Sequence, residues 1–194
     1  MNRTFLFVGL LAILGFSADS QERLRTIDWL PNENRMGNAI ADENGRFKPS
    51  EIKALSIVSI SVEGRPITPG RSFGAGESWL KTLTVRLKNT SDQPIKSIRF
   101  HFLLPEAKNG EKISGFSLEY GKELSTGIGY GEQKLVAPGD EVDIVRNEKH
   151  YERDSTAIAM RTGVSDFSQI IIGTAQVILA DGTSWISWKL PLER

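Results

Sequence analysis

From residue 54 onward the sequence alternates between apolar and polar side chains, and this period of two constrains the fold more than any other feature. The clearest runs cover residues 58–62, 83–87, 98–102, 142–144 and 171–179, with a shorter one at 186–188. Alternation buries one face of a strand and leaves the other in water, which is typical of antiparallel sheets. The sequence therefore predicts a mostly β domain with Val85, Phe100 and Val177 in its core.

The segments between these runs carry turn chemistry. They are rich in Asn, Asp, Gly and Pro, and they cover residues 89–94, 137–140 and 180–183. Asp181-Gly182 between two apolar runs is a strong hairpin signal. One stretch departs from the pattern, because Asp154 or Ser155 could cap a short helix over residues 156–162. Short strands joined by such turns indicate an all-β fold, a two-layer antiparallel β-sandwich with at most one short helix.

The first 18 residues have the layout of a secretory signal peptide. Arg3 supplies a positive charge, residues 5–16 form an uncharged apolar run, and the small residues Ser17 and Ala18 follow it. A membrane span needs about 20 apolar residues, and this run is shorter. We therefore expect a cleaved signal peptide at residues 1–18, export to the periplasm or the medium, and no membrane span after cleavage.

Cysteine is absent from the 194 residues, so disulfides, thiol catalysis and thiolate metal sites are excluded. An exported domain without disulfides depends on its core alone for stability, which favours a bacterial origin. Lys plus Arg and Asp plus Glu number 24 each. The chain therefore has no net positive charge that would attract nucleic acid, and we do not expect nucleic acid as a partner.

Residues 19–50 are polar and irregular, and we interpret them as a linker or as an arm that lies on the domain. The sandwich domain then covers residues 51–194, and a chain that begins near Pro49 should fold with nearly the stability of the mature protein. Trp29 and Leu30 form one apolar pair within the polar segment. They either dock on their own domain or anchor a binding partner.

Residues 83–95 (LTVRLKNTSDQPI) resemble the strand-turn-strand of FxLYD-type and related immunoglobulin-like domains of exported bacterial proteins. Residues 137–140 (APGD) are similar to a later Pro-Gly turn of these domains, and residues 181–185 (DGTSW) are similar to their closing hairpin. The resemblance covers about residues 55–190. It implies an immunoglobulin-like antiparallel β-sandwich that is a non-catalytic module, and it assigns no functional residues.

Residues 70–74 (GRSFG) match the G-x-S-x-G motif of serine hydrolases. The chain order permits a triad of Ser72, then Asp140 or Asp143, then His150. The motif works on a tight turn from a strand into a helix, and here an alternating strand follows the motif instead. A small serine hydrolase that uses Ser72 is therefore the alternative to a non-catalytic function.

The two histidines and their acidic neighbours offer one other chemistry. His101 falls on the outward face of its strand, so we expect an ordinary surface histidine. His150, Glu152 and Asp154 together could bind a divalent cation, but their spacing matches neither a helical H-E-x-x-H motif nor an EF-hand. We therefore expect no metal and no cofactor.

Trp185 completes the set of candidate binding residues. It lies on the opposite face of its strand from Ile186 and Trp188, so it could be an exposed aromatic, and packing at a sheet edge is the other interpretation. Trp29, Leu30 and Trp185 are thus the candidate binding residues, and no residue receives a catalytic role. The sequence favours an exported, non-catalytic module that binds or supports a protein or glycan partner in the cell envelope.

Overall fold

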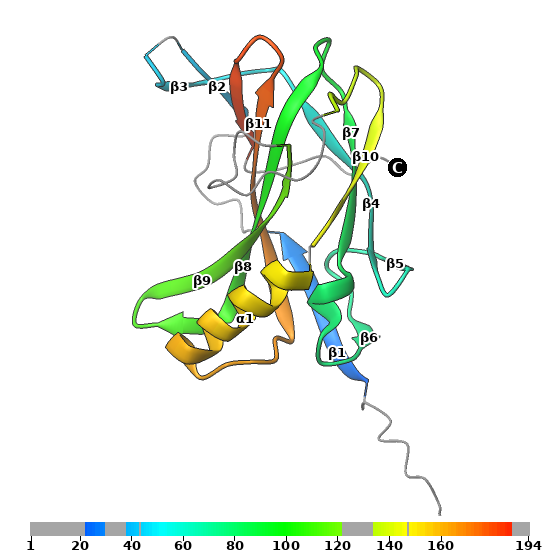
Figure 1. Ribbon diagram of the computed structural model, residues 1–194, viewed down its shortest axis with the longest axis vertical. Helices are drawn as coiled ribbons and strands as arrows, with labels where there is room; N and C mark the ends of the chain where they lie inside the picture. The colour runs from blue at the N-terminus through cyan, green and yellow to red at the C-terminus, as the bar shows by residue number, and fades with distance from the viewer. Residues whose placement is uncertain (1–21, 30–37, 43, 122–133, 147, 188–194) are drawn as a thin grey trace, which may run out of the picture.

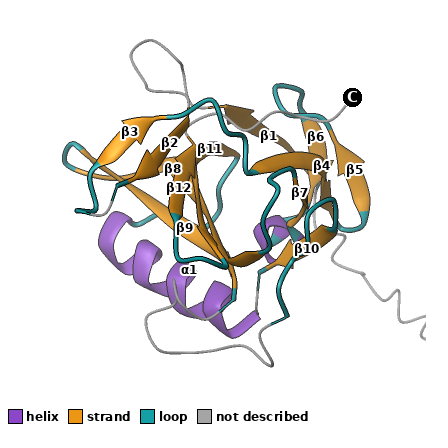
Figure 2. Ribbon diagram, turned by 90° about the horizontal axis from the view of Figure 1, so that it is seen from above, coloured by secondary structure: helices purple, strands orange, loops and turns teal. Residues whose placement is uncertain are grey.

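Two β-sheets that pack together account for most of the described chain, and an α-helix lies along one side of them (Figures 1 and 2). This computed structural model describes residues 22–29, 38–42, 44–121, 134–146 and 148–187. The architecture confirms the prediction of an all-β sandwich with one helix over these residues.

The larger sheet has eight strands and the smaller sheet has four. The larger sheet contains β1 (Arg23–Trp29), β2 (Asn38–Ala41), β3 (Phe47–Pro49), β6 (Phe73–Ala75), β8 (Ile95–Asn109), β9 (Lys112–Tyr120), β11 (Gln169–Leu179) and β12 (Ser184–Ser187). The smaller sheet runs in the order β10 (Glu141–Val145), β7 (Thr84–Asn89), β4 (Leu55–Val62) and β5 (Arg65–Ile67). A 3₁₀-helix, η1 (Trp79–Thr82), precedes β7, and the helix α1 (Glu148–Thr162) separates β10 from β11 in the chain.

Strand β11 is the centre of the larger sheet, because it pairs with three strands, β1, β8 and β12. β8 runs antiparallel along one edge. On the other edge, β1 pairs with residues 169–172 and β12 pairs with residues 175–178. The two strands thus occupy successive stretches of the same edge of β11. The β1–β11 pairing is parallel, whereas the other pairings between described strands are antiparallel. This parallel pair is a departure from the predicted antiparallel sandwich.

Strands β1, β2 and β3 lie within residues 19–50, where the sequence predicted a linker or an arm. Ile27 and Ala39 in this segment are fully buried. The prediction is wrong for these strands because β1 inverts the usual pattern: Arg25 is buried, whereas Leu24 is 74% exposed. A search for apolar residues along one face does not detect such a strand. A domain boundary near residue 51 would therefore cut through the larger sheet.

The core contains most of the side chains that alternation assigned to it. Three predicted core residues are fully buried, namely Val85, Phe100 and Val177. In β4 and β11, a β-bulge changes which side chains of the strand face the core. In β4 the bulge buries Ile57 rather than Val58. In β11 it buries Ile172 rather than Ile171.

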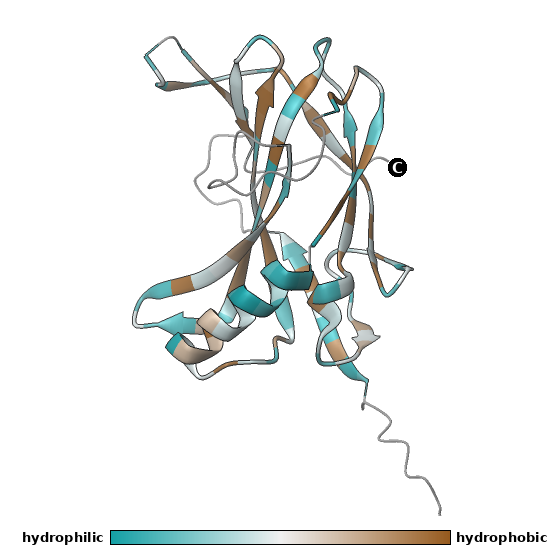
Figure 3. Ribbon diagram, in the orientation of Figure 1, coloured by the Kyte–Doolittle hydropathy of each residue, from teal (hydrophilic) through white to brown (hydrophobic). Residues whose placement is uncertain are grey.

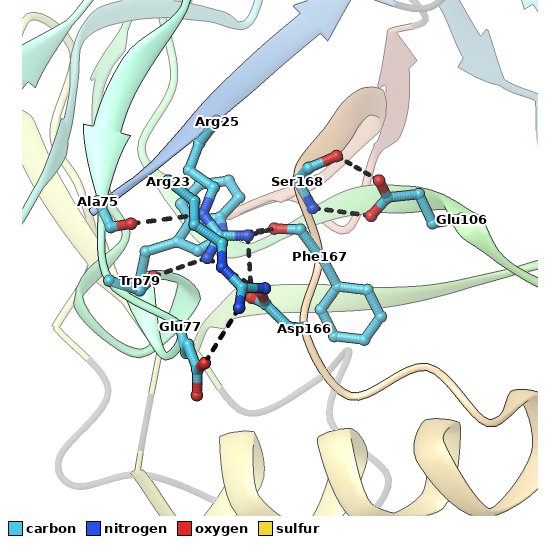
Figure 4. Close-up of polar contacts among 10 residues, drawn as sticks. Arg23, Arg25, Ala75, Glu77, Trp79, Glu106, Asp166, Phe167 and Ser168 are labelled. Carbon is cyan, nitrogen blue, oxygen red and sulfur yellow. Dashed lines mark hydrogen bonds and ion pairs between the residues drawn. The ribbon is translucent and has the colours of Figure 1, made fainter. Parts of the chain in front are cut away.

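Arg25 of β1 is 1% exposed, and its guanidinium joins three segments of the chain (Figure 4). Nη1 donates to the carbonyl oxygen of Phe167 at 2.8 Å, and Nη2 donates to that of Gly76 at 3.2 Å. The carboxylate of Asp166 lies 2.9 Å from Nη1 and 3.1 Å from Nη2. The indole of Trp79 donates to the same Phe167 carbonyl at 2.7 Å. Since a buried charge is costly without partners, these contacts allow Arg25 to face inward.

Helix α1 begins at Glu148, well before residue 156, where the sequence predicted its start. Its first half is charged, and Ile158 is its buried residue. Figure 3 accordingly shows the start of the helix in hydrophilic colours. This half has no apolar stripe in the sequence, and Glu148 at its start forms an exposed ion pair with Lys81 of η1. Among the described residues, none of the helices combines the length and the apolar character that a bilayer span requires.

Removal of residues 1–48 tests the place of β1 and β2 in the larger sheet. The deletion takes away the partner of residues 169–172, the buried Ile27 and the Arg25 contacts. We expect the shortened chain to lose cooperative unfolding, because these losses approach the ~5–15 kcal/mol that stabilises a typical domain. Urea unfolding followed by tryptophan fluorescence measures this. Equal midpoints for the shortened and mature chains would instead make the segment a linker.

Asp166→Ala tests the ion pair of the buried Arg25. The change leaves the Arg25 guanidinium buried without its carboxylate, so we expect the free energy of unfolding to fall by about 3 kcal/mol or more. Glu77→Ala is the matched control, because Glu77 and its partner Arg23 are both largely exposed and lie 3.6 Å apart. An exposed pair contributes about 0–1 kcal/mol. Similar losses in the two variants, measured by urea denaturation, would contradict a special role for Asp166.

Candidate functional site

A cleft of about 710 Å³ lies between β9, β10 and α1. β9 ends one arm of the larger sheet and β10 ends the smaller sheet, so each has one edge without a partner strand in the described part of the chain. In Figure 1 β10 runs towards the start of α1, and Figure 2 shows the three elements on one side of the molecule. The volume falls in the range of about 300–1,000 Å³ that is typical of ligand sites.

The lining of the cleft comes from four elements and from the residue that follows β10. It comprises His101 of β8, residues 115–120, residues 143–146, and His150, Arg153, Asp154, Ala157, Ile158 and Arg161 of α1. Most of the helix residues recur at intervals of three or four, which places them on one face. That face of α1 forms one wall of the cleft.

The strands meet the cleft edge-on. Successive residues of β9, 115–120, and of β10, 143–145, all line it. Successive side chains of a strand point to opposite faces of the sheet, so only the edge of a strand presents all of them together. The cleft is therefore bordered by the backbone edges of two strands. N–H and C=O groups at such an edge can pair with a further strand.

Arg146 forms part of the inner wall, with 4% of its side chain exposed. Its guanidinium carbon lies 3.9 Å from the centroid of the Phe116 ring, and Nη2 donates to Asp154 Oδ2 at 3.0 Å. Burial lowers the pKa of Arg146, and the negative charge of Asp154 opposes this shift. Nε is buried and has no hydrogen-bond partner among the residues that the structure describes. The wall thus holds a buried cation whose hydrogen-bonding capacity is not filled.

Each carboxylate in the described lining forms an ion pair with an arginine. The pairs are Glu119 with Arg99 at 2.7 Å, Asp143 with Arg86 at 2.7 Å, and Asp154 with both Arg146 and Arg153 at 3.0 Å. The hydrogen bonds from Arg86 lower the pKa of Asp143 below its usual value. A carboxylate held ionised in this way is a weak general acid, so Asp143 is poorly placed for that role.

A smaller hollow of about 320 Å³ continues the cleft along β9. Its lining includes Asn109, Lys112, Ile113 and Ser114, and it shares Gly115 and Arg161 with the cleft. We call the cleft and this hollow together the β9 groove.

His101 faces outward on its strand, as predicted, but it is half-buried in the wall of the cleft. Its ring lies over glycines of the two neighbouring strands: a Cβ added at Gly115 or Gly173 would come within 3.1 or 3.6 Å of it. Nδ1 lies 3.2 Å from Ser117 Oγ. Burial lowers the pKa of His101, and the nearby Arg99 lowers it further. The expectation of an ordinary surface histidine is therefore wrong.

The candidate binding residues from the sequence are placed elsewhere or are not described. Trp29 is half-buried against the core, and Leu30 lies outside the described residues. Trp185 is 1% exposed, and its indole donates to the carbonyl oxygen of Ile52 at 3.0 Å. Of the two interpretations of Trp185, the exposed aromatic is wrong, because Trp185 pairs with the buried Val177 across the hairpin and directly opposed residues share a face.

Ser72 is exposed in the loop before β6, and the described lining of the cleft does not include it. A strand follows the motif, where the hydrolase elbow needs a helix. His150 and Asp143 do line the cleft, but Asp143 is bound by Arg86. Asp140, the other acid considered, lies in the exposed turn before β10. These positions do not assemble a triad with Ser72 in the cleft.

The three residues considered for a divalent cation lie on α1. His150 and Asp154 are one turn apart and both line the cleft, whereas Glu152 is exposed and is not part of the described lining. Asp154 is already bound by Arg146 and Arg153. Over the described ranges, no group of three or more His, Cys, Asp or Glu side chains is placed to hold a metal ion.

The sequence analysis did not identify Arg146 and Arg161 as residues of the cleft, although the sequence around Arg146 contains a sign of its position. It continues the inward series of Val142 and Ile144, so an arginine stands where an apolar residue is expected. Arginine is rarely buried unless it is paired, and such a position therefore marks a special site. Arg161 leaves no comparable signal, because its place in the groove depends on how α1 packs beside β9.

The half-buried His101 predicts a loss of stability in mild acid. Its pKa is lowered in the folded protein, whereas an unfolded chain protonates histidine near pH 6.5. Below about pH 6.5 the unfolded state binds more protons, so the free energy of unfolding falls as the pH falls. Urea unfolding at about pH 7.5 and about pH 5.5 should show a smaller difference for His101→Gln than for the wild type. The same difference in both chains would disprove this role.

Comparisons with models of protein families, with curated proteins and with solved structures found no match for this chain. Its function is therefore inferred from the geometry of the cleft.

Proposed function

We propose that this protein is an exported, non-catalytic module that binds an extended segment of a protein partner in the cleft between β9 and β10. The observation that carries the proposal is the pair of strand edges at residues 115–120 and 143–145, which border one cleft. The signal peptide expected at residues 1–18 supports export. The positions of Ser72 and Asp143 support a role without catalysis.

Strand addition explains how such a cleft would bind. An extended peptide joins a sheet edge through main-chain hydrogen bonds, and pockets for alternate side chains provide specificity. The cleft supplies the edges from β9 and β10 and side-chain walls from α1. Because α1 closes one side, the space favours one added strand rather than open-ended association of sheets.

The charges of the cleft favour a peptide over a neutral glycan. Arg146, Arg153 and Arg161 line it together with the carboxylates of Glu119 and Asp154. A neutral sugar offers no charge that complements these groups, whereas a peptide can carry such charges on its side chains. Its backbone can also satisfy the N–H and C=O groups at the strand edges.

Ala157→Trp tests the cleft as the binding site. Ala157 is exposed on α1 and lines the cleft, so a tryptophan there fills part of the space without entering the core. Peptides selected on the wild-type chain from a random display library should bind the variant at least about tenfold more weakly, a difference of about 1.4 kcal/mol. Fluorescence anisotropy with the selected peptides measures the affinities.

Thr156→Trp is the matched control, because Thr156 is the exposed neighbour on α1 and is not part of the described lining. It should leave the affinity unchanged. Equal binding to the Ala157→Trp chain and the wild type would place the site elsewhere. A selection that enriches no peptide would refute peptide binding altogether.

A further inference from the structure

The β9 groove carries more positive than negative charge. Its cationic side chains are Arg146, Arg153, Arg161 and Lys112. Its carboxylates are already neutralised: Glu119 and Asp143 pair with arginines outside the lining, and Asp154 is shared by two arginines. The chain as a whole has a formal net charge of +0, so this surplus is local to the groove.

Arg161 and Lys112 are the cations most open to a ligand. Arg161 is exposed, and its Nε donates to the carbonyl oxygen of Ala157 at 3.0 Å. Within the described chain its two Nη groups have no carboxylate partner, and it lines both the cleft and the hollow. Lys112 is also exposed, and it forms no ion pair with the residues that the structure describes.

The inner wall adds a further positive group. Arg146 and Arg153 both depend on the single carboxylate of Asp154, and the buried Nε of Arg146 has no partner among the described residues. Two guanidinium groups around one carboxylate leave a positive charge that a ligand anion can match. The surplus therefore extends from the hollow into the cleft.

We infer that the partner segment is acidic: an extended peptide that lies along β9 and presents aspartate or glutamate side chains to Arg161 and Lys112. This inference rests on the proposed function and adds the chemistry of its ligand. In an extended peptide every second side chain points to the same face, at intervals of about 7 Å. An alternating acidic and apolar sequence would thus direct its carboxylates towards α1 as a row.

Two synthetic probes test the inference. One is a fluorescein-labelled peptide of alternating glutamate and valine, about eight residues long to match a strand of this size, and the other replaces each glutamate with lysine. Fluorescence anisotropy with the purified chain should show binding of the glutamate peptide and not of the lysine peptide. Raising the salt from about 20 mM to about 200 mM should weaken binding, because the Debye length shortens.

Arg161→Glu should weaken binding of the glutamate peptide about fivefold or more, because it removes one attraction and adds one repulsion. Arg71→Glu is the matched control, since Arg71 is exposed in a loop and does not belong to the described lining. It should change the affinity less than about twofold. Both positions are exposed, so both variants should fold, and far-UV circular dichroism checks this.

Equal binding of the two probes, binding of neither, or equal effects of the two substitutions would overturn the acidic ligand class. The display selection separates this failure from that of the proposed function. If the selected peptides are neutral and fail to bind the Ala157→Trp chain, peptide binding in the cleft is supported and the acidic preference is rejected. If the selection yields no binders and neither synthetic peptide binds, both the proposed function and the acidic preference are rejected.

Discussion

The ion pair between the buried Arg25 and Asp166 connects parts of the molecule that lie far apart along the chain. Arg25 belongs to β1, and Asp166 lies in the segment between α1 and β11. The same guanidinium also bonds to carbonyl groups at residues 75–76, beside β6. One side chain thereby fixes β1 between β11 and β6 and anchors the segment through which the chain leaves α1. Neither Arg25 nor Asp166 belongs to the described lining of the cleft.

Two arginines of the described chain are buried, and they are satisfied to different degrees. Arg25 donates to three carbonyl oxygens and faces a carboxylate. Arg146 lies over the Phe116 ring, shares Asp154 with another arginine and keeps an unfilled Nε. The nitrogens of Arg25 all donate to an acceptor, although Oδ1 of its partner Asp166 is buried without a hydrogen bond from the described residues. Arg146 keeps a buried donor without an acceptor, and it does so at the border of the cleft, where a further group could supply one.

Alternation predicts β7, the hairpin of β11 and β12, and the burial of Phe100, since these features depend on residues near one another in sequence. It fails at β1, where Arg25 takes an inward position, and at the bulges of β4 and β11, where parity shifts. The start of α1 is not predicted because its first half is polar, and the buried residue of the helix, Ile158, lies further along. The cleft could not be predicted, because it forms where three elements that are distant in sequence meet. The one sign of it in the sequence is Arg146, an arginine at the inward position after Ile144.

The parallel pairing of β1 with β11 has a consequence for the order of folding. Arg25 and Phe167, which are hydrogen-bonded beside this pair of strands, stand 142 positions apart in the chain. A ribosome delivers β1 well before β11, while the β8–β9 hairpin can form in between. Contacts between such distant segments slow folding, because loop closure precedes the gain from pairing. The larger sheet thus closes only after β11 has been synthesised, so β1 has no parallel partner until then.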